Sequence, residues 1–398
     1  MLIKLASKSL NDRRSSVFLS FVAMAISVFV LMGVEYVRGQ AKESFSNTVS
    51  GMDLIVGART GQLNLLLYSV FRMGTPTNNI EWNSFLDVAN NPDVAWAVPV
   101  SLGDSHQGYR VLGTTVDYFK HYSFGQKRQL EFREGRQFSA TLDVVLGSEV
   151  AAQLNYKLGD KLVLAHGIGS TSFKVHEEQK FTVTGVLAPT GTPVDRTVHI
   201  SLAGMEAIHE ADSTDNAELE PDSITAIFVG LKTRFATFQL QRDIGDYKQE
   251  PLMAILPGVA LSELWEMMSA IEGILQLISS LVLFAALMGM ASMMAATIRE
   301  RRNEIRLLRI VGASPMFLAV LFELEALLLA SISITGGLLM LVAGVILAAD
   351  FLSSNYGLFL AEISLTSQTL WLIALIYIAT FIIAAIPALA AYREASQS

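Results

Sequence analysis

The stretch TIRERRNEIRLLRIVGASP (Thr297–Pro315) lies between two long apolar segments of this chain. Its five arginines are half of the ten Lys and Arg residues found outside residues 35–270. Positive charge at this density, next to segments long enough to cross a bilayer, is typical of a cytoplasmic loop. The stretch therefore predicts that both neighbouring apolar segments have their near ends at the cytoplasmic face of a membrane.

The spacing within this stretch predicts a short helix with a defined end. Glu300, Glu304 and Leu308 are four residues apart, so they would line one face of a helix. Gly312 favours the left-handed backbone that commonly ends a helix, and Pro315 prevents its continuation. We therefore expect a short amphipathic helix inside the cell that stops before Pro315.

Two interpretations of this helix are open, a solvated loop that only sets topology or a helix that docks onto a soluble partner. The apolar stripe Ile305, Leu308 and Val311 favours docking, because a topology signal needs no such stripe. The predicted coupling residues are Glu300, Arg301, Glu304, Ile305, Leu308, Arg309, Gly312 and Ala313.

The overall composition is an average over two parts of the chain that differ in hydropathy and in charge. Its 398 residues are 52% hydrophobic, with a mean hydropathy of +0.43. Residues 35–270 carry 19 Lys and Arg against 28 Asp and Glu, and such an acidic domain argues against nucleic acid as a partner. The sequence contains no cysteine, which excludes disulfides and thiolate metal sites.

The first apolar run, residues 15–34, is about 20 residues or roughly 30 Å long as a helix, which matches one hydrocarbon core. Lys4, Lys8, Arg13 and Arg14 precede it and predict a cytoplasmic N-terminus. A secretory signal peptide is the alternative, but its apolar region is shorter and ends at small residues suited to cleavage. We favour a retained membrane helix.

Residues 35–270 predict a soluble α+β domain with a helical stalk at each end, because short strand-like runs alternate with short helices. Residues 211–222 are acidic and without apolar periodicity, so they predict an exposed loop. The strand expected after this loop would pair back with the first strands and make two subdomains. The expected strands are 53–58, 95–102, 109–115, 143–147, 161–165, 180–187, 197–201 and 224–231, and the expected helices are 82–90, 148–154 and 235–244.

The whole pattern predicts an α-helical membrane protein with four transmembrane helices and a large α+β extracytoplasmic domain inserted between helices 1 and 2. The expected parts are 1–34 for the cytoplasmic N-terminus and helix 1, 35–270 for the outer domain, 271–297 for helix 2, 298–315 for the cytoplasmic helix, 316–349 for helix 3, 350–368 for a short outer loop, 369–390 for helix 4 and 391–398 for a cytoplasmic tail.

Two carboxylates, Glu323 and Glu325, lie near the cytoplasmic edge of the third apolar segment. Ionisable groups inside a membrane segment are costly, so they are functional candidates. We expect an interfacial position near Arg306 or Arg309 in preference to a proton relay.

Small residues in the second apolar segment, Ala285, Gly289, Ser292 and Ala296, would permit close approach of another helix. They are a candidate dimer seam, and packing within one protomer is the alternative. Gly336, Gly337 and Gly344 in the third segment leave the same two alternatives open.

All six histidines (His106, His121, His166, His176, His199 and His209) fall in the expected outer domain. Their spacing does not suit a metal site, and we expect surface histidines and no metal. A G-x-S-x-G hydrolase motif and a G-x-x-x-x-G-K-[ST] phosphate loop are both absent. These observations predict that the chain is not an enzyme.

Three motifs resemble one family, the MacB/FtsX-like permeases of type VII ABC transporters. They are ERRNEIRLLRIVGAS (Glu300–Ser314), ELEALLL (Glu323–Leu329), and GRQFSATLDVVLGSEVAAQLNYKLGD (Gly135–Asp160) with FTVTGVL (Phe181–Leu187). Two features depart from the family pattern. Arg306 stands where a small residue is common, and the stretch Asp53–Ile80 is not general to the family.

The resemblance implies a homodimeric permease of the bacterial inner membrane, with both termini cytoplasmic and a MacB-like periplasmic core domain. It implies a separate cytoplasmic ATPase dimer that binds ATP and Mg, so this chain would hold no cofactor. ATP hydrolysis would drive export or extraction of a substrate through movement of the periplasmic domain. The alternative is an FtsX-like scaffold that relays ATP hydrolysis to a periplasmic protein partner without transport.

Overall fold

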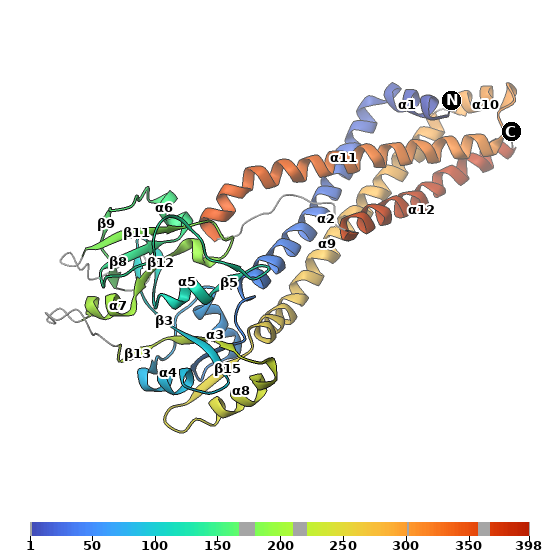
Figure 1. The fold of residues 1–398 in the computed structure, drawn as a ribbon. Coiled ribbons are helices and arrows are strands. Elements are labelled where there is room, and N and C mark those ends of the chain that lie inside the picture. Colours follow the sequence, from blue (N-terminus) through green and yellow to red (C-terminus); the bar gives the residue numbers. More distant parts are fainter. Residues whose placement is uncertain (1, 167–179, 210–220, 301, 357–366, 398) are drawn as a thin grey trace. The chain divides into compact units, whose positions relative to one another are not determined.

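The computed structural model describes residues 2–166, 180–209, 221–300, 302–356 and 367–397 (Figure 1). The chain forms two compact units. The helical unit is drawn from residues 1–40, 269–351 and 360–398, and the mixed unit from residues 41–268 and 352–359. The boundary between the two units falls within two long helices, α2 and α9.

The helices that contribute to the helical unit are α1 (Leu2–Asp12), α2 (Arg14–Thr48), α9 (Pro257–Glu300), α10 (Arg302–Ile310), α11 (Pro315–Tyr356) and α12 (Ser367–Gln397). Four of them, α2, α9, α11 and α12, contain segments long and apolar enough to cross a membrane. The 44 residues of α9 correspond to roughly 66 Å of helix, about twice a hydrocarbon core. Such a length leaves room for the helical stalk that the sequence predicts.

Helices α2 and α11 approach each other closely in the helical unit. A Cβ atom added to Gly336 would lie 3.0 Å from the ring of Phe21, and one added to Gly337 would lie 2.8 Å from the carbonyl oxygen of Ala25. Glycine at these positions therefore lets the α11 backbone pack directly on α2. The surrounding core contains Met24, Val28, Leu287, Met290, Phe322, Ala330, Ile376 and Ala384.

The mixed unit is built on an 11-stranded sheet with the strand order β15-β1-β14-β3-β4-β12-β8-β11-β7, in which β10 also pairs with β3 and β9 with β11. The main strands are β1 (Leu54–Ala58), β3 (Val94–His106), β4 (Tyr109–Thr114), β7 (Phe132–Gly135), β8 (Asp143–Leu146), β11 (Phe181–Leu187), β12 (Thr197–Ser201), β14 (Ala226–Leu231) and β15 (Leu252–Ile255). The short strands are β2 (Ile80–Glu81), β5 (Ser123–Phe124), β6 (Arg128–Gln129), β9 (Lys161–Leu162), β10 (Ala165–His166) and β13 (Ser223–Ile224).

Helices flank this sheet. They are α3 (Gln62–Ser69), α4 (Trp82–Ala89), α5 (Asp117–His121), α6 (Ser148–Gln153), α7 (Leu202–His209) and α8 (Thr237–Gly245), with 3₁₀ turns at Pro193–Arg196 and Arg234–Ala236. The sequence analysis missed α3, α5 and α7. The apolar run of α3, QLNLLLYS, is too short for its periodicity to separate a helix from a buried strand.

The strand pairing confirms one expectation and corrects another. Strand β14 pairs with both β1 and β3, so the strand expected after residues 211–222 does return to the first strands. The exposed loop predicted for residues 211–222 lies almost entirely outside the described residues. However, β12 runs parallel to β4 and β11 parallel to β8, so the unit is mixed α/β in part and not simply α+β. Parallel strands need long crossover connections, and a local sequence pattern does not show which strands such a connection joins. The predicted subdomains also share one continuous sheet.

Candidate functional site: the α10 helix and its surroundings

The end of α10 confirms the predicted stop. Gly312 has a φ of +102°, the left-handed conformation that glycine adopts without strain. The backbone N–H of Ala313 donates to the carbonyl of Leu308 at 2.9 Å, and that of Gly312 to the carbonyl of Arg309 at 3.0 Å. These two bonds form a Schellman motif, which satisfies carbonyls that the helix end would otherwise leave free.

The next helix, α11, begins immediately after this stop. Ser314 caps it, because its Oγ accepts a hydrogen bond from the backbone N–H of Phe317 at 3.1 Å. Pro315 occupies the first turn, where its missing N–H costs nothing. The serine and proline of the motif therefore start the third apolar helix as well as ending the short one.

The apolar residues of α10 divide between two faces. Ile305 is only 7% exposed and packs in the core of the helical unit. Leu307, Ile310 and Val311 are 61%, 80% and 86% exposed, and Leu308 is 37% exposed. The sequence placed Ile305 on the docking stripe, and this placement is corrected, because its side chain is already covered by its own chain. Amphipathic spacing reveals an apolar face but not what covers it.

The structure describes only some of the remaining predicted coupling residues. Glu300 is exposed and forms the end of α9, so it does not belong to the short helix. Arg301 lies outside the described residues, as does the side chain of Glu304. Arg309 donates a hydrogen bond from Nη1 to the carbonyl of Ala313 at 3.1 Å and so supports the helix end.

A buried ion pair lies beside α10. Arg13, between α1 and α2, bonds from Nη2 to Oε2 of Glu325 at 3.1 Å, and the carboxylate residue is only 3% exposed. The same guanidinium donates to Ser9 Oγ at 3.0 Å and to Thr297 Oγ1. Sequence analysis expected Arg306 or Arg309 near this carboxylate, and the structure corrects that expectation.

The ion pair ties together segments that are far apart in the chain. Thr297 belongs to α9 and Glu325 to α11, so Arg13 holds the start of α2 against both helices. Removing one partner of a buried pair typically costs about 3–5 kcal/mol, because a buried charge remains uncompensated. Glu323 is half-buried, and its Oε1 has no hydrogen-bond partner among the described residues.

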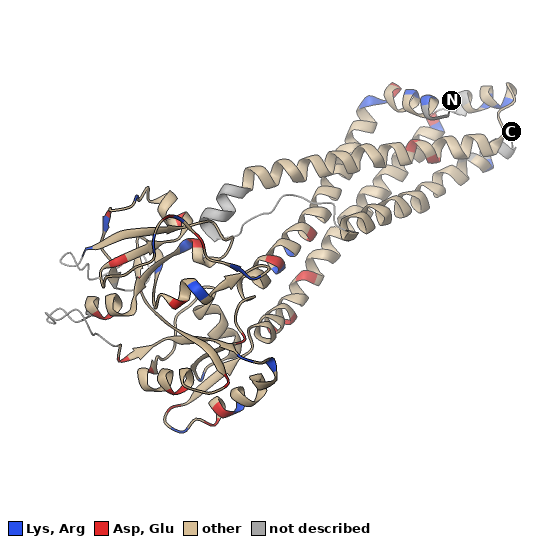
Figure 2. Ribbon diagram, in the orientation of Figure 1, with Lys and Arg blue, Asp and Glu red and all other residues tan. Residues whose placement is uncertain are grey.

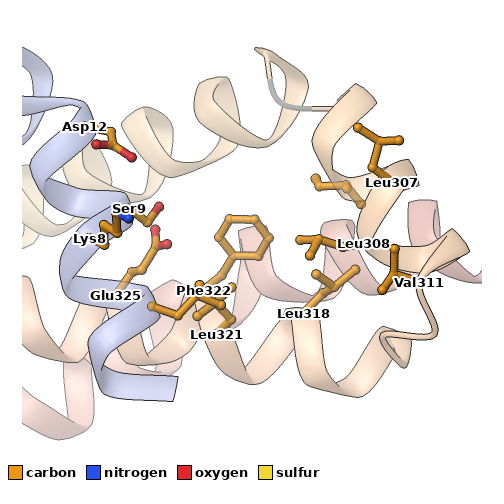
Figure 3. Close-up of a pocket in the computed structure, with 12 residues that line it drawn as sticks. Lys8, Ser9, Asp12, Leu307, Leu308, Val311, Leu318, Leu321, Phe322 and Glu325 are labelled. Carbon is orange, nitrogen blue, oxygen red and sulfur yellow. The ribbon is translucent and has the colours of Figure 1, made fainter. Parts of the chain in front are cut away.

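A cavity of about 400 Å³ opens between α1, α10 and α11, all within the helical unit (Figure 3). Its walls are mostly apolar, and Glu325 forms part of them. The lining residues are Leu5, Lys8, Ser9, Asp12, Ile305, Leu307, Leu308, Val311, Leu318, Leu321, Phe322 and Glu325.

The small-residue stripe of α9 is open in the described structure. Ala285, Gly289, Ser292 and Ala296 are all exposed, and a Cβ atom at Gly289 would meet no described atom within 4 Å. Packing of this stripe within the protomer, one of the two alternatives, is therefore not seen in the described part of the chain. The dimer seam stays a prediction.

The mixed unit contains a buried polar cluster that the sequence analysis missed. His199 and Tyr118 are fully buried with ring centroids 5.5 Å apart, and their side-chain polar atoms form no well-directed hydrogen bond among the described residues. Burial and the positive charge of Arg72 lower the pKa of His199 to about 3. Arg72 lies in the stretch Asp53–Ile80 that departs from the family pattern and has a φ of +61°.

The expectation of surface histidines is wrong for two residues. His199 is 0% and His106 is 5% exposed, and the latter contacts the Val163 carbonyl at 2.7 Å and the Tyr156 hydroxyl at 3.0 Å. His176 lies outside the described residues. No group of three or more metal-ligating side chains occurs in the part of the chain that the structure describes.

Comparisons with known proteins agree with this architecture. The MacB-like periplasmic core domain matches residues 17–247, and the FtsX-like permease C-terminal domain matches residues 277–396. A search of curated proteins gives no significant match.

Two solved structures show low similarity. The periplasmic region of MacB from Actinobacillus actinomycetemcomitans is 11% identical, covering 55% of this chain and 97% of that chain with a TM-score of 0.37. The extracellular domain of the ABC-type transporter YknZ from Gram-positive bacteria is 10% identical, covering 51% of this chain and 98% of that chain with a TM-score of 0.32. Because the two family matches together span most of the sequence, this chain belongs to the MacB/FtsX-like permeases of ABC transporters.

Proposed function

We propose that this chain is the membrane subunit that couples ATP hydrolysis in a separate ATPase dimer to movement of the mixed unit on the outer side of a bacterial inner membrane. The observation that carries this proposal is the exposed apolar surface at the end of α10, formed by Leu307, Ile310 and the next residue, Val311. Exposed apolar residues rimmed by charge are typical of a surface that binds another protein. The movement would drive export or extraction of a substrate.

The proposed topology has four membrane crossings, both termini in the cytoplasm, and the mixed unit outside between the first and second crossings. Figure 2 shows Lys and Arg along α1 and α10 of the helical unit. Positive charge favours the cytoplasmic side, so these two helices would lie there together. The absence of Lys and Arg from residues 350–368 supports an outer location for that segment.

Two contacts support transmission of movement along α2 and α9. In the helical unit, Arg38 pairs with Glu272 at 3.7 Å. In the mixed unit, the rings of Phe45 and Trp265 meet edge to face with centroids 5.6 Å apart. A displacement of α9 by a partner bound at α10 would therefore carry α2 with it, because packed helices move as bodies.

Each subunit of the proposed ATPase dimer would bind one copy of this chain, and a homodimer of this chain would supply both copies. The exposed stripe Ala285, Gly289, Ser292 and Ala296 is the proposed seam, because small residues let two helices approach closely in a bilayer.

The second candidate function is a scaffold that relays ATP hydrolysis to a periplasmic protein without transport. Charged residues are few in the apolar segments 15–34, 273–296, 316–349 and 369–390, where the sequence has only Glu323 and Glu325. This scarcity favours the scaffold, because a polar cargo would find little charged path through these segments. Stimulation of ATPase activity in liposomes by a small substrate would favour transport. Stimulation only by a protein partner would favour the scaffold.

Copurification with the cognate ATPase tests the docking surface. We expect the double variant Leu307→Asp with Ile310→Asp to lose most of the bound ATPase, because charge is placed on the exposed apolar face. Asn303→Asp is the matched control, since it adds an acidic group at an exposed polar position of the same helix. Undiminished ATPase binding by the double variant would contradict the proposal.

A further inference from the structure

We propose that the cavity between α1, α10 and α11 binds a phospholipid with a primary ammonium in its headgroup, such as phosphatidylethanolamine. This lipid site lies beyond the coupling role. It rests on the proposed function only through the placement of α1 and α10 at the cytoplasmic face of a bilayer.

The cavity itself is amphipathic. Figure 3 shows its polar side chains gathered at one end, formed by Lys8, Ser9, Asp12 and Glu325. The other end is apolar and is formed by Leu307, Leu308, Val311 and Leu318, with Phe322 between the two ends. Its volume of about 400 Å³ is within the usual range for small-molecule sites, about 300–1,000 Å³. A ligand with one charged end and one apolar end fits this division.

One carboxylate oxygen at the polar end lacks a hydrogen-bond donor. Glu325 is 3% exposed, and its Oε2 is bound by Arg13 at 3.1 Å. Its Oε1 is buried and has no partner among the residues that the structure describes. A buried carboxylate oxygen without a donor is costly, and an ammonium N–H would supply a strong charge-assisted hydrogen bond. The cavity therefore favours a ligand that carries N–H donors at its polar end.

The charges at the polar end favour a zwitterion over a net ion. Lys8 and Arg13 are cationic and Asp12 and Glu325 are anionic, so their formal charges cancel. A phosphate would lie toward Lys8 and an ammonium toward the two carboxylates, which places each charge beside its opposite. Lys8 and Asp12 are exposed, so the headgroup would keep contact with water.

The apolar end of the cavity would hold an acyl chain of the lipid. Leu318 is 1% exposed and Leu321 6% exposed, and both belong to the first turns of an apolar helix. An acyl chain of the inner leaflet is the apolar group available at that level, and it would supply van der Waals contacts that these side chains lack on the cavity side. A bound lipid would contact α1, α10 and α11 together and would restrain the helix that we propose to dock.

Native mass spectrometry of the full chain in detergent tests the site with three lipids of identical acyl chains. We expect phosphatidylethanolamine to bind about tenfold more tightly than phosphatidylcholine, which corresponds to about 1.4 kcal/mol. Phosphatidylcholine has the same net charge but no N–H donors on its nitrogen. Phosphatidylglycerol, which has no cation, should also bind more weakly. Equal binding of phosphatidylethanolamine and phosphatidylcholine would overturn the proposal.

Pairs of variants, one inside and one outside the cavity lining, test whether the lipid binds in this cavity. Leu308→Trp fills the apolar end and should weaken phosphatidylethanolamine binding at least about tenfold, about 1.4 kcal/mol. Asn303→Trp lies on the same helix at an exposed position and does not line the cavity, so it should bind as the parent chain does. Lys8→Met should weaken binding, whereas Lys4→Met, one turn earlier and not in the lining, should not. Unchanged binding by Leu308→Trp would place the lipid elsewhere.

A second measurement keeps the test valid if Leu308→Trp disturbs folding. Asp12 is exposed, and Asp12→Asn should reduce the preference for phosphatidylethanolamine over phosphatidylcholine while total lipid binding persists. An unchanged preference would contradict the assigned polar end. No ATPase is present in these experiments, so undiminished ATPase copurification in the docking test, together with the expected lipid preference of the parent chain, would refute only the coupling proposal.

Discussion

Two helices of the helical unit, α9 and α11, both carry small residues at regular spacing, yet they use them differently. Gly336 and Gly337 on α11 bring its backbone against Phe21 and Ala25 of α2. Gly289 on α9 is exposed and has open space around it in the described structure. A small-residue stripe thus shows that close approach is allowed, but only the tertiary contacts show whether the partner is the same chain.

The largest effect is expected at the ion pair between Arg13 and Glu325 of the helical unit. Arg13→Met should destabilise the helical unit by about 3–5 kcal/mol, because Glu325 would remain buried without its cation. Thermal unfolding of the purified chain measures the loss. Arg14→Met is the control, because Arg14 is exposed and bonds only to Asn11 of its own turn in the described structure. Equal stability of the two variants would show that the pair does not hold the unit together.

The α11 glycines come next. Gly337→Leu should destabilise the unit by about 1–3 kcal/mol, because even its Cβ would lie 2.8 Å from the side chain of Val28. Gly344→Ala is a milder control, since its Cβ would make ordinary contact with Phe29 at 3.5 Å. The yield of monodisperse protein and its unfolding temperature report the difference. If Gly337→Leu were as stable as the parent chain, close packing of α11 on α2 would not require glycine. The small residues of α9 and α11 would then not differ in their use.

The mixed unit supplies a prediction that does not depend on helix packing. His199 is neutral when folded, because its pKa is lowered to about 3 by burial and by Arg72. The unfolded chain gains a proton as the pH falls below about 6.5, while the folded chain does not, so stability is complete above that pH and declines below it. The expected slope is about 1.4 kcal/mol per pH unit between pH 6 and 4.

Denaturant unfolding at several pH values measures this slope. The His199→Gln variant should lack the contribution of this group, although it changes the overall stability. A slope that is unchanged in the variant would show that His199 does not titrate as its burial predicts.

The smallest effect on folding is expected at the exposed stripe. Gly289→Leu should change unfolding stability by less than about 0.5 kcal/mol, because the added side chain meets open space in the described structure. It should nevertheless weaken self-association in detergent, measured by analytical ultracentrifugation, if the stripe is the dimer seam. Gly273→Leu, also on α9 and without described neighbours, is the control for added bulk. If Gly289→Leu self-associates as strongly as the parent chain, the dimer seam does not include Gly289.

The sequence predicted features that depend on neighbouring residues. The four apolar helices and the stop at Gly312 follow from runs, spacing and the backbone freedom of one glycine, all of which act within a few residues. Most strands of the mixed unit, such as β1 and β11, were found for the same reason. The family motifs also lie in continuous stretches, and the family matches confirm the resemblance that these motifs indicated.

The tertiary structure decided which residues meet across long separations. Arg13 and Glu325 are 312 residues apart, and local charge patterns favoured Arg306 or Arg309 as the partner. The parallel pairing of β8 with β11 and the burial of Ile305 likewise depend on what the folded chain places alongside each element. Interactions between residues close in the sequence determine where helices and strands form and where they end. The choice among equally apolar or equally charged neighbours is made by packing, because only packing brings distant segments together.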